Sequence, residues 1–167
     1  RIDLLERQLI KNNIEIHNVP FTSKENLREI VLKLCVNSLQ VDIDNRSIDT
    51  CYRKKSYNKN DCDLPIVVRF CSYDIKMKIM KKKYELKPKI KSDVIVPGSE
   101  KMIYINDYLT SNTKKIYYEA KKIKEIIKFK HLWIRNNNVM IRQSDGDDII
   151  HLRSLNDIFS LNVKSNI

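Results

Sequence analysis

Residues 13–20 of the chain are Asn-Ile-Glu-Ile-His-Asn-Val-Pro, the clearest strand pattern in the sequence. Apolar and polar side chains alternate along it, which places Ile14 and Ile16 on one face and is typical of a strand with one buried face. Pro20 ends the run, because proline has no N–H to donate to a strand ladder. The pattern therefore predicts the first strand of a sheet, over residues 13–19.

Helical and strand-like patterns alternate in the residues that follow. A capping-box spacing at Thr22 opens an apolar helical stripe over 25–38, and Ser72 precedes a second stripe over 73–85. Alternating apolar residues predict three further strands, at 47–54, 65–71 and 102–105. The order is strand, helix, strand, strand, helix, strand, which predicts one antiparallel sheet with both helices on its back.

A shared core follows from this arrangement, because the helices and the sheet must bury their apolar faces against each other. The side chains expected in it are Ile14, Ile16, Leu27, Val31, Ile66, Val68 and Phe70. Glu15 and Arg69 alternate with these residues and are expected outside the core. Either of them inside it would mean that a strand register is shifted by one residue.

The C-terminal third of the chain has a pattern of its own. Thr110 or Thr113 caps a helix with a regular apolar stripe. The next elements expected are a hairpin, made of 132–135 and 139–142 around three asparagines that tolerate positive φ, and a closing helix at 154–161.

Prolines and a glycine at positions 88, 97 and 98 predict a linker at about 87–100. Near the start, Ile2, Leu5 and Leu9 have the 3 and 4 spacing of a coiled-coil seam, so we expect the end of an oligomerising helix there. The predicted domains are 1–12, the end of this helix; 13–108, the sheet domain with its linker; and 109–167, a small C-terminal domain. The predicted fold class is α+β.

Positive charge is concentrated in two segments. The chain has a formal net charge of +11, and residues 76–91 and 114–130 carry eight and seven lysines against few carboxylates. Local basic charge of this kind indicates contact with a polyanion, either the phosphates of a nucleic acid or an anionic membrane face. The alternative is that these lysines form solvated helix faces that serve only solubility.

The residue types needed for catalysis or metal binding are absent or badly spaced. Two glycines cannot form a phosphate-binding loop, and the three histidines belong to no recognisable catalytic pattern. The four cysteines, at 35, 51, 62 and 71, fit neither a zinc site nor a redox pair. Asp145-Gly-Asp-Asp148 lacks the spacing of a calcium loop and is expected to be a turn. We therefore expect no enzyme activity, no metal and no cofactor, and no apolar run reaches the roughly 18 residues of a membrane span.

Trp133 alternates with Leu132 and Ile134 in the predicted hairpin. Two roles are open to it, packing over the neighbouring apolar helix or stacking on a base. Packing is the expected role, because a lone tryptophan beside an apolar helix stripe normally covers it.

Several stretches carry a family resemblance. They are Asn13 to Pro20 with Glu25-Asn-Leu27, Ser47 to Arg53 ending in Tyr-Arg, Pro65 to Phe70, Ile105 to Thr110, and Phe129 to Arg135 followed by Val139 to Arg142. Together they resemble the baculovirus few-polyhedra proteins and, more distantly, the first-open-reading-frame proteins of LINE retrotransposons (transposase family 22).

The order of elements also resembles an RNA-recognition motif, but Glu15, Pro65 and Val67 stand where that motif has base-stacking aromatics. The resemblance thus implies a degenerate RNA-recognition-motif-like, ferredoxin-type sandwich, followed by a small α+β domain. In the retrotransposon proteins such parts form a trimeric chaperone that binds single-stranded nucleic acid. In the few-polyhedra proteins they belong to a viral factor in virion envelopment and occlusion, with no established enzyme activity.

The resemblance implies a chain that acts inside an infected host cell, in the cytoplasm or nucleus, or in the virion, and that self-associates through an upstream coiled coil. Arg53, Arg135 and Arg142 match the positions of nucleic-acid contacts in the related proteins, so the resemblance implies that they contact single-stranded nucleic acid. With the lysines of the basic segments, the candidate set is Arg53, Lys54, Lys121, Lys122, Lys128, Lys130, Arg135 and Arg142. The alternative is a structural or interaction protein whose lysines meet acidic viral or host proteins or membranes.

Overall fold

The computed structural model describes residues 2–56, 63–87 and 89–164, with side chains described as far as Leu161. Cys62 and Pro88, which entered the expectations above, lie outside the described residues. The chain divides into two compact units. One comprises Ile10–Tyr108, and the other combines residues 1–9 with Leu109–Ile167.

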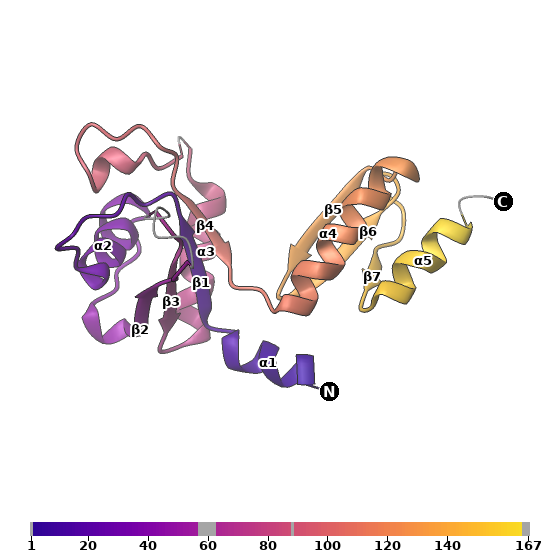
Figure 1. The fold of residues 1–167 in the computed structure, drawn as a ribbon, viewed down its shortest axis with the longest axis horizontal. Helices are drawn as coiled ribbons and strands as arrows, with labels where there is room; N and C mark the ends of the chain where they lie inside the picture. The colour runs from indigo at the N-terminus through magenta and orange to yellow at the C-terminus, as the bar shows by residue number, and fades with distance from the viewer. Residues whose placement is uncertain (1, 57–62, 88, 165–167) are drawn as a thin grey trace. The chain divides into compact units, whose positions relative to one another are not determined.

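The first unit is built around a four-stranded sheet with the strand order β2-β3-β1-β4, in which every pairing is antiparallel (Figure 1). Its main elements are β1 (Asn13–His17), α2 (Leu27–Leu32), β2 (Ile48–Arg53), β3 (Ile66–Phe70), α3 (Tyr73–Glu85) and β4 (Tyr104–Asp107). All six correspond to predicted elements, and α3 has the predicted bounds. Ser72 begins α3 as expected, since its hydroxyl accepts from the N–H of Ile75 at 3.2 Å.

The expected core is confirmed. Six of its seven predicted members are buried, and Leu27 is half-buried against them. Val31 of α2 and Ile79 of α3 belong to the same cluster, so both helices cover one face of the sheet. Each fully buried Ile or Phe side chain stabilises the fold by about 1.5–3 kcal/mol.

Glu15 is buried too, at 5% exposed, but on the opposite face of the sheet from this core. It lies across from Val67, whereas Ile14 lies across from Val68 and points into the core. Arg69 is exposed and pairs with Asp49 at 2.5 Å. The predicted strand registers are therefore correct, because burial of Glu15 arises from neighbours on the outer face.

The helix expected over 25–38 begins later and changes its winding. Asn26 is its N-cap, with a side-chain oxygen that accepts from the N–H of Glu29 at 3.3 Å. The capping box predicted from Thr22 is wrong, because Glu25 is engaged by Arg53 instead. After α2 the chain continues as a π-helix over Lys33–Ser38.

Residues 89–99, most of the expected linker, pack onto the first unit. Ile90 is buried in its core, and its carbonyl accepts from the N–H of Ile103 at 2.9 Å. Lys91 and Met102 form an antiparallel bridge, and a 3-10 turn follows at Ser92–Val94.

The second unit contains a three-stranded antiparallel sheet in the order β5-β6-β7. Its elements are α1 (Ile2–Ile10), α4 (Ser111–Ile126), β5 (His131–Arg135), β6 (Asn138–Arg142), β7 (Ile150–Leu152) and α5 (Leu155–Lys164). Figure 1 shows α4 lying along β5 and β6, and one apolar cluster joins α4 and α5 to the sheet. Strand β7 was not predicted, although Ile150 and Leu152 alternate with His151.

Two local predictions in this unit are confirmed. Thr110 caps α4, with its hydroxyl accepting from the N–H of Thr113 at 3.1 Å. Asn136 and Asn137 have φ values of 51° and 59°, as the two central residues of a type I′ hairpin turn require.

Helix α1 is joined to the second unit by polar contacts. The hydroxyl of Thr110 donates to Asp3 at 2.8 Å, and Arg7 donates to the side chain of Asn138 at 3.1 Å. The predicted seam residues Ile2, Leu5 and Leu9 are 76%, 62% and 74% exposed. The helix is present as predicted, and the coiled coil itself stays a prediction.

Candidate functional site

The hairpin β5-β6 has an apolar face and a basic face. Leu132 and Ile134 pack against the cluster beneath α4. Because successive side chains of a strand point to opposite faces, the alternate residues His131, Trp133 and Arg135 lie on the other face. Arg142 pairs across the ladder with His131, so it shares that face. The hairpin thus separates its apolar residues from its cationic ones.

Trp133 is therefore not where it was expected. Packing over the α4 stripe is wrong for this residue, because β5 turns Leu132 and Ile134 toward the helix and Trp133 away from it. Its side chain is half-buried, next to Met140 on the neighbouring strand. The alternation that revealed this was visible in the sequence.

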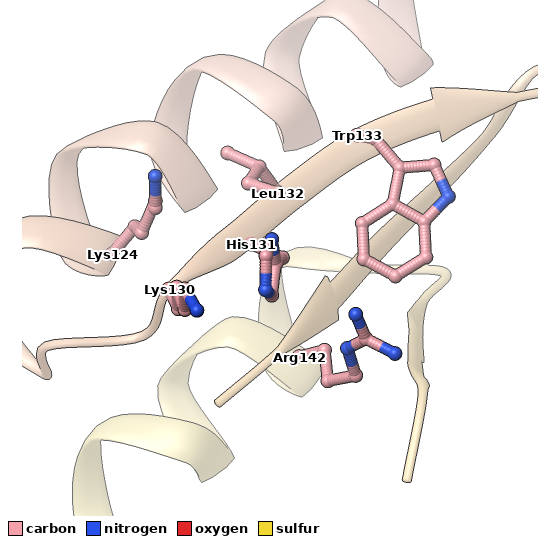
Figure 2. A pocket seen from close by; sticks show the side chains of 6 residues that line it. All are labelled: Lys124, Lys130, His131, Leu132, Trp133 and Arg142. Carbon is pink, nitrogen blue, oxygen red and sulfur yellow. The ribbon is translucent and has the colours of Figure 1, made fainter. Parts of the chain in front are cut away.

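An open pocket of about 410 Å³ lies at this end of the hairpin, and Figure 2 shows the side chains around it. It is lined by Lys124, Lys130, His131, Leu132, Trp133 and Arg142. Three permanent cations and an aromatic ring thus line one small space. Lys124 and Trp133 were outside the predicted set of contact residues.

The backbone holds these side chains in place. The N–H of Lys130 donates to the carbonyl of Gln143 at 2.8 Å, which extends the hairpin ladder past its last paired strand residues. The N–H of Phe129 donates to the carbonyl of Lys124 at 3.2 Å and anchors the turn that follows α4. Lys124 and Lys130 are therefore presented from a fixed corner of the unit.

Three of the pocket's basic groups converge on one carboxylate, Asp145. Lys130 forms an ion pair with it, His131 Nε2 lies 2.5 Å from Oδ1, and the guanidinium of Arg142 lies 3.5 Å from Oδ1. Hydrogen bonds from Lys130 and then His131 hold the pKa of the Asp145 carboxyl below its usual range. Asp145 lies in the exposed turn after β6, so three basic residues of the pocket already contact one anion that the chain itself supplies.

Arg142 keeps an unused donor. Its side chain is 28% exposed, and no acceptor in the described part of the chain reaches its buried Nε. Figure 2 shows Arg142 on the same side of the hairpin as Trp133. An arginine beside an indole, with a free donor, suits a ligand that combines a flat ring with a negative charge.

The other predicted residues of this unit surround the pocket less closely. Lys121 and Lys122 are exposed on α4, where Lys122 pairs with Glu119 at 2.9 Å. Lys128 is exposed just after α4 with a φ of 56°. Arg135 is exposed at the far end of β5. The structure thus brings Lys130 and Arg142 together and spreads the remaining four around them.

Arg53 and Lys54 belong to the first unit. Arg53 is half-buried, and its guanidinium donates to the carboxylate of Glu25 and to the carbonyls of Val19 and Leu64. Lys54 forms an ion pair with Glu15, and its Nζ lies 5.1 Å from the ring centre of Tyr108. Both cations are engaged by internal partners.

The residue of the Tyr-Arg pair that faces outward is Tyr52. It lies across from Val67 on the outer face of the large sheet and is 49% exposed. Next to Val67 in the same row is Glu15, covered by its ion pair with Lys54. The centre of this face thus presents an ion pair where an RNA-recognition motif would need an aromatic ring. Tyr52 was not among the predicted contact residues, although its alternation with Cys51 and Arg53 indicated that its side chain points to the outer face.

In residues 2–56, 63–87 and 89–164, no group of three or more His, Cys, Asp or Glu side chains is placed to hold a metal ion. No helix in this part of the chain is both long and apolar enough to cross a bilayer. Asp145 and its neighbours form a turn, as expected.

Comparison with protein families gives a match for the second unit. Residues 110–162 match the family model described as baculovirus FP protein domain 2. The matched segment runs from the cap of α4 into α5 and includes every residue of the pocket. No curated protein matches the chain.

Proposed function

We propose that the chain is a viral protein of the few-polyhedra type that binds single-stranded nucleic acid without catalysing a reaction, because residues 110–162 match domain 2 of the baculovirus FP proteins. Its setting is an infected host cell. The binding serves virion envelopment or occlusion in this proposal, as the family resemblance implies. The element order of the first unit supports a degenerate RNA-recognition-motif-like domain in the same chain.

The observation that carries the proposal is the convergence of Lys130, His131 and Arg142 on Asp145. Groups that bind one carboxylate at hydrogen-bond distance are arranged for a phosphate as well, since both are compact oxyanions. A nucleic-acid phosphate enters this site by displacing Asp145. The exposed turn that bears Asp145 allows that exchange without disturbing the core.

Trp133 favours a single strand over a duplex. Its ring lies on the same face as the cations, and base stacking on an aromatic side chain is possible only for an unpaired base. A phosphate on Arg142 and a neighbouring base on Trp133 would use both groups at once. Every base has a face that can stack, so little sequence preference is expected.

The test compares the full chain with paired variants in titrations of single-stranded RNA, single-stranded DNA and duplex, at 50 and 200 mM salt. Replacing Lys130 and Arg142 together by Ala should flatten the salt dependence by about 1.4 in log–log slope, since each lost phosphate contact removes about 0.7 for single strands. Replacing Lys121 and Lys122 should flatten it less. Replacing Lys78 and Lys81, which are exposed in the first unit, is the charge-matched control.

Equal losses in the control variant would mean that binding follows net charge and has no site. If the unmodified chain binds none of the three nucleic acids at 50 mM salt, the proposal fails. The alternative of an interaction protein with acidic partners then stands.

Self-association is a second part of the proposal. Helix α1 carries an exposed apolar row at coiled-coil spacing, formed by Ile2, Leu5 and Leu9. Each of these side chains is more than half exposed. Two or more copies of α1 would bury this row against one another.

A further inference from the structure

The basic segment 76–91 belongs to the first unit, whereas the pocket proposed for nucleic acid lies in the second. Two of the eight lysines of this segment pair with carboxylates. Lys76 is buried and reaches Asp107 at 2.5 Å, and Lys82 lies 3.6 Å from Glu85. Three others gather around a pocket in the first unit, next to β4.

This basic pocket has a volume of about 340 Å³. Its floor is apolar and includes Leu39, Ile90, Ile103 and Ile105. Its rim is formed by Lys83, Tyr84, Lys87, Lys89 and Tyr104. No carboxylate is among the described residues that line it, so the pocket suits a ligand with an apolar part and a negative charge.

The rim is organised by contacts between lysines and tyrosines. The Nζ of Lys83 lies 4.5 Å from the ring centre of Tyr84, and that of Lys89 lies 5.6 Å from the ring centre of Tyr104. Burial lowers the pKa of Lys83, with the nearby carboxylate of Asp107 opposing part of that shift. A half-buried ammonium gains from an anionic partner, because less water competes for it.

The pocket adjoins the edge of the four-stranded sheet. β4 is the outermost strand of the sheet order β2-β3-β1-β4, and Tyr104 and Ile105 belong both to β4 and to the pocket. Just before β4, Ile90 and Lys91 already pair with the residues 102–103 as a short additional strand. An extended peptide can continue this pairing along β4 and point alternate side chains into the pocket.

We propose that the basic pocket binds an acidic peptide segment of a partner protein. One large apolar side chain of the peptide enters the pocket, its flanking carboxylates contact Lys83, Lys87 and Lys89, and its backbone pairs with the edge of β4. The apolar floor disfavours a nucleic acid, which would bring phosphates there. The strand edge favours a peptide over a lipid, because only a peptide uses backbone hydrogen bonds. This interaction is separate from nucleic-acid binding.

The probe is a synthetic peptide, Glu-Glu-Val-Phe-Val-Glu-Glu, capped at both ends and labelled with fluorescein, and its binding to the full chain is followed by anisotropy. Replacing Lys87 and Lys89 together by Glu should weaken binding by roughly tenfold or more, since like charges then face the carboxylates. Tyr104→Ala should also weaken it. All these residues are exposed, so the melting temperature should not change. Replacing Lys78 and Lys81 by Glu makes the same charge change away from the pocket and should leave binding within about twofold.

Three results would overturn the proposal. The peptide fails to bind, or the Lys78 and Lys81 control loses as much affinity as the pocket variant, or a peptide with Ser in place of Phe binds equally well. Direct binding of an oligonucleotide or of phosphatidylserine vesicles that is lost with the same pocket substitutions would assign the pocket to those ligands instead. The Lys130 and Arg142 double variant should bind the peptide normally, which keeps this outcome distinct from that of the proposed function.

Discussion

The guanidinium of Arg53 holds the carboxylate of Glu25 with two parallel hydrogen bonds, 2.8 Å from Nε to Oε1 and 2.6 Å from the second terminal nitrogen to Oε2. Both side chains are only 10% exposed. The remaining terminal nitrogen donates to the carbonyls of Val19 and Leu64 at 3.1 and 2.7 Å. Arg53 thereby ties the end of β2 to the chain segments after β1 and before β3.

Arg53→Ala is therefore expected to lower the free energy of unfolding, by about 3–5 kcal/mol, because it leaves the buried Glu25 carboxylate without its partner. Urea unfolding of the full chain measures this. Arg46→Ala is the control: it breaks a pair with Asp44 whose side chains are 92% and 56% exposed, and should change stability by less than about 1 kcal/mol. Equal stability of the two variants would show that the Arg53 pair is not structural.

Trp133 is expected to report on bound nucleic acid. Single-stranded oligonucleotide should quench its fluorescence, and Trp133→Leu should weaken binding by about 1–3 kcal/mol, the usual range for one stacked base. Because Trp133 lies away from the apolar cluster, the same change should alter the free energy of unfolding by less than about 1 kcal/mol. Strong destabilisation with unchanged binding would return Trp133 to a packing role.

Asp145→Asn should strengthen binding of single strands by about 1 kcal/mol, because it removes the carboxylate that competes with phosphate for Lys130 and Arg142. Asp148→Asn removes the same charge from the same turn outside this cluster and should have a smaller effect. Affinity measurements at one fixed salt concentration compare the two. Equal gains would show that only net charge matters.

In a His131→Asn background, which removes the imidazole that contacts Asp145, the gain from Asp145→Asn should not vary between pH 5 and 8. The pKa of the Asp145 carboxyl is lowered in the folded chain, so the group stays ionised throughout that range. Its ion pairs contribute to stability above the unfolded-state pKa of about 3.9, and this contribution is lost as pH falls through the lower folded-state pKa. A gain that fades already at pH 6 would contradict this.

Cysteine reactivity should follow burial. Burial raises the pKa of the Cys35 thiol to about 12, whereas Cys71 is exposed. In a Cys62→Ser background at pH 8, a thiol reagent should modify Cys71 quickly and Cys35 only after unfolding. The free energy of unfolding should therefore fall as pH rises beyond about 8.5, because the folded state retains the Cys35 proton while the unfolded thiol loses it above that pH. Rapid labelling of Cys35 in the folded chain would contradict the packing described.

Leu5→Lys combined with Leu9→Lys should abolish self-association through α1, since both side chains lie on its exposed apolar row. Light scattering of the full chain measures the mass. The fold should be unaffected, because α1 has no buried residues. If the unmodified chain is a monomer at all accessible concentrations, this segment alone does not associate.

Local sequence patterns were sufficient to predict most of the helices and strands. Alternation of period 2 gave the strands of the first unit and the hairpin, and helical stripes gave α3 and α4. The turn between β5 and β6 was predicted from its adjacent asparagines, because the conformation of this turn depends on the tolerance of asparagine for positive φ. β7 was missed because three residues are too short for a period to stand out.

Neighbouring positions in the sequence were sufficient to predict the apolar face of most elements and the concentration of basic charge in two segments. They could not predict which charged side chains have partners, or that Glu15 and Lys76 are buried, because those contacts join residues far apart in the chain. Arg53 meets Glu25 from 28 positions away, and Lys76 meets Asp107 across the first unit, so neither remains available for phosphate. Lys130, Arg142 and Trp133 come together only when the hairpin closes, because the ladder register, rather than any spacing along the chain, sets which side chains share a face.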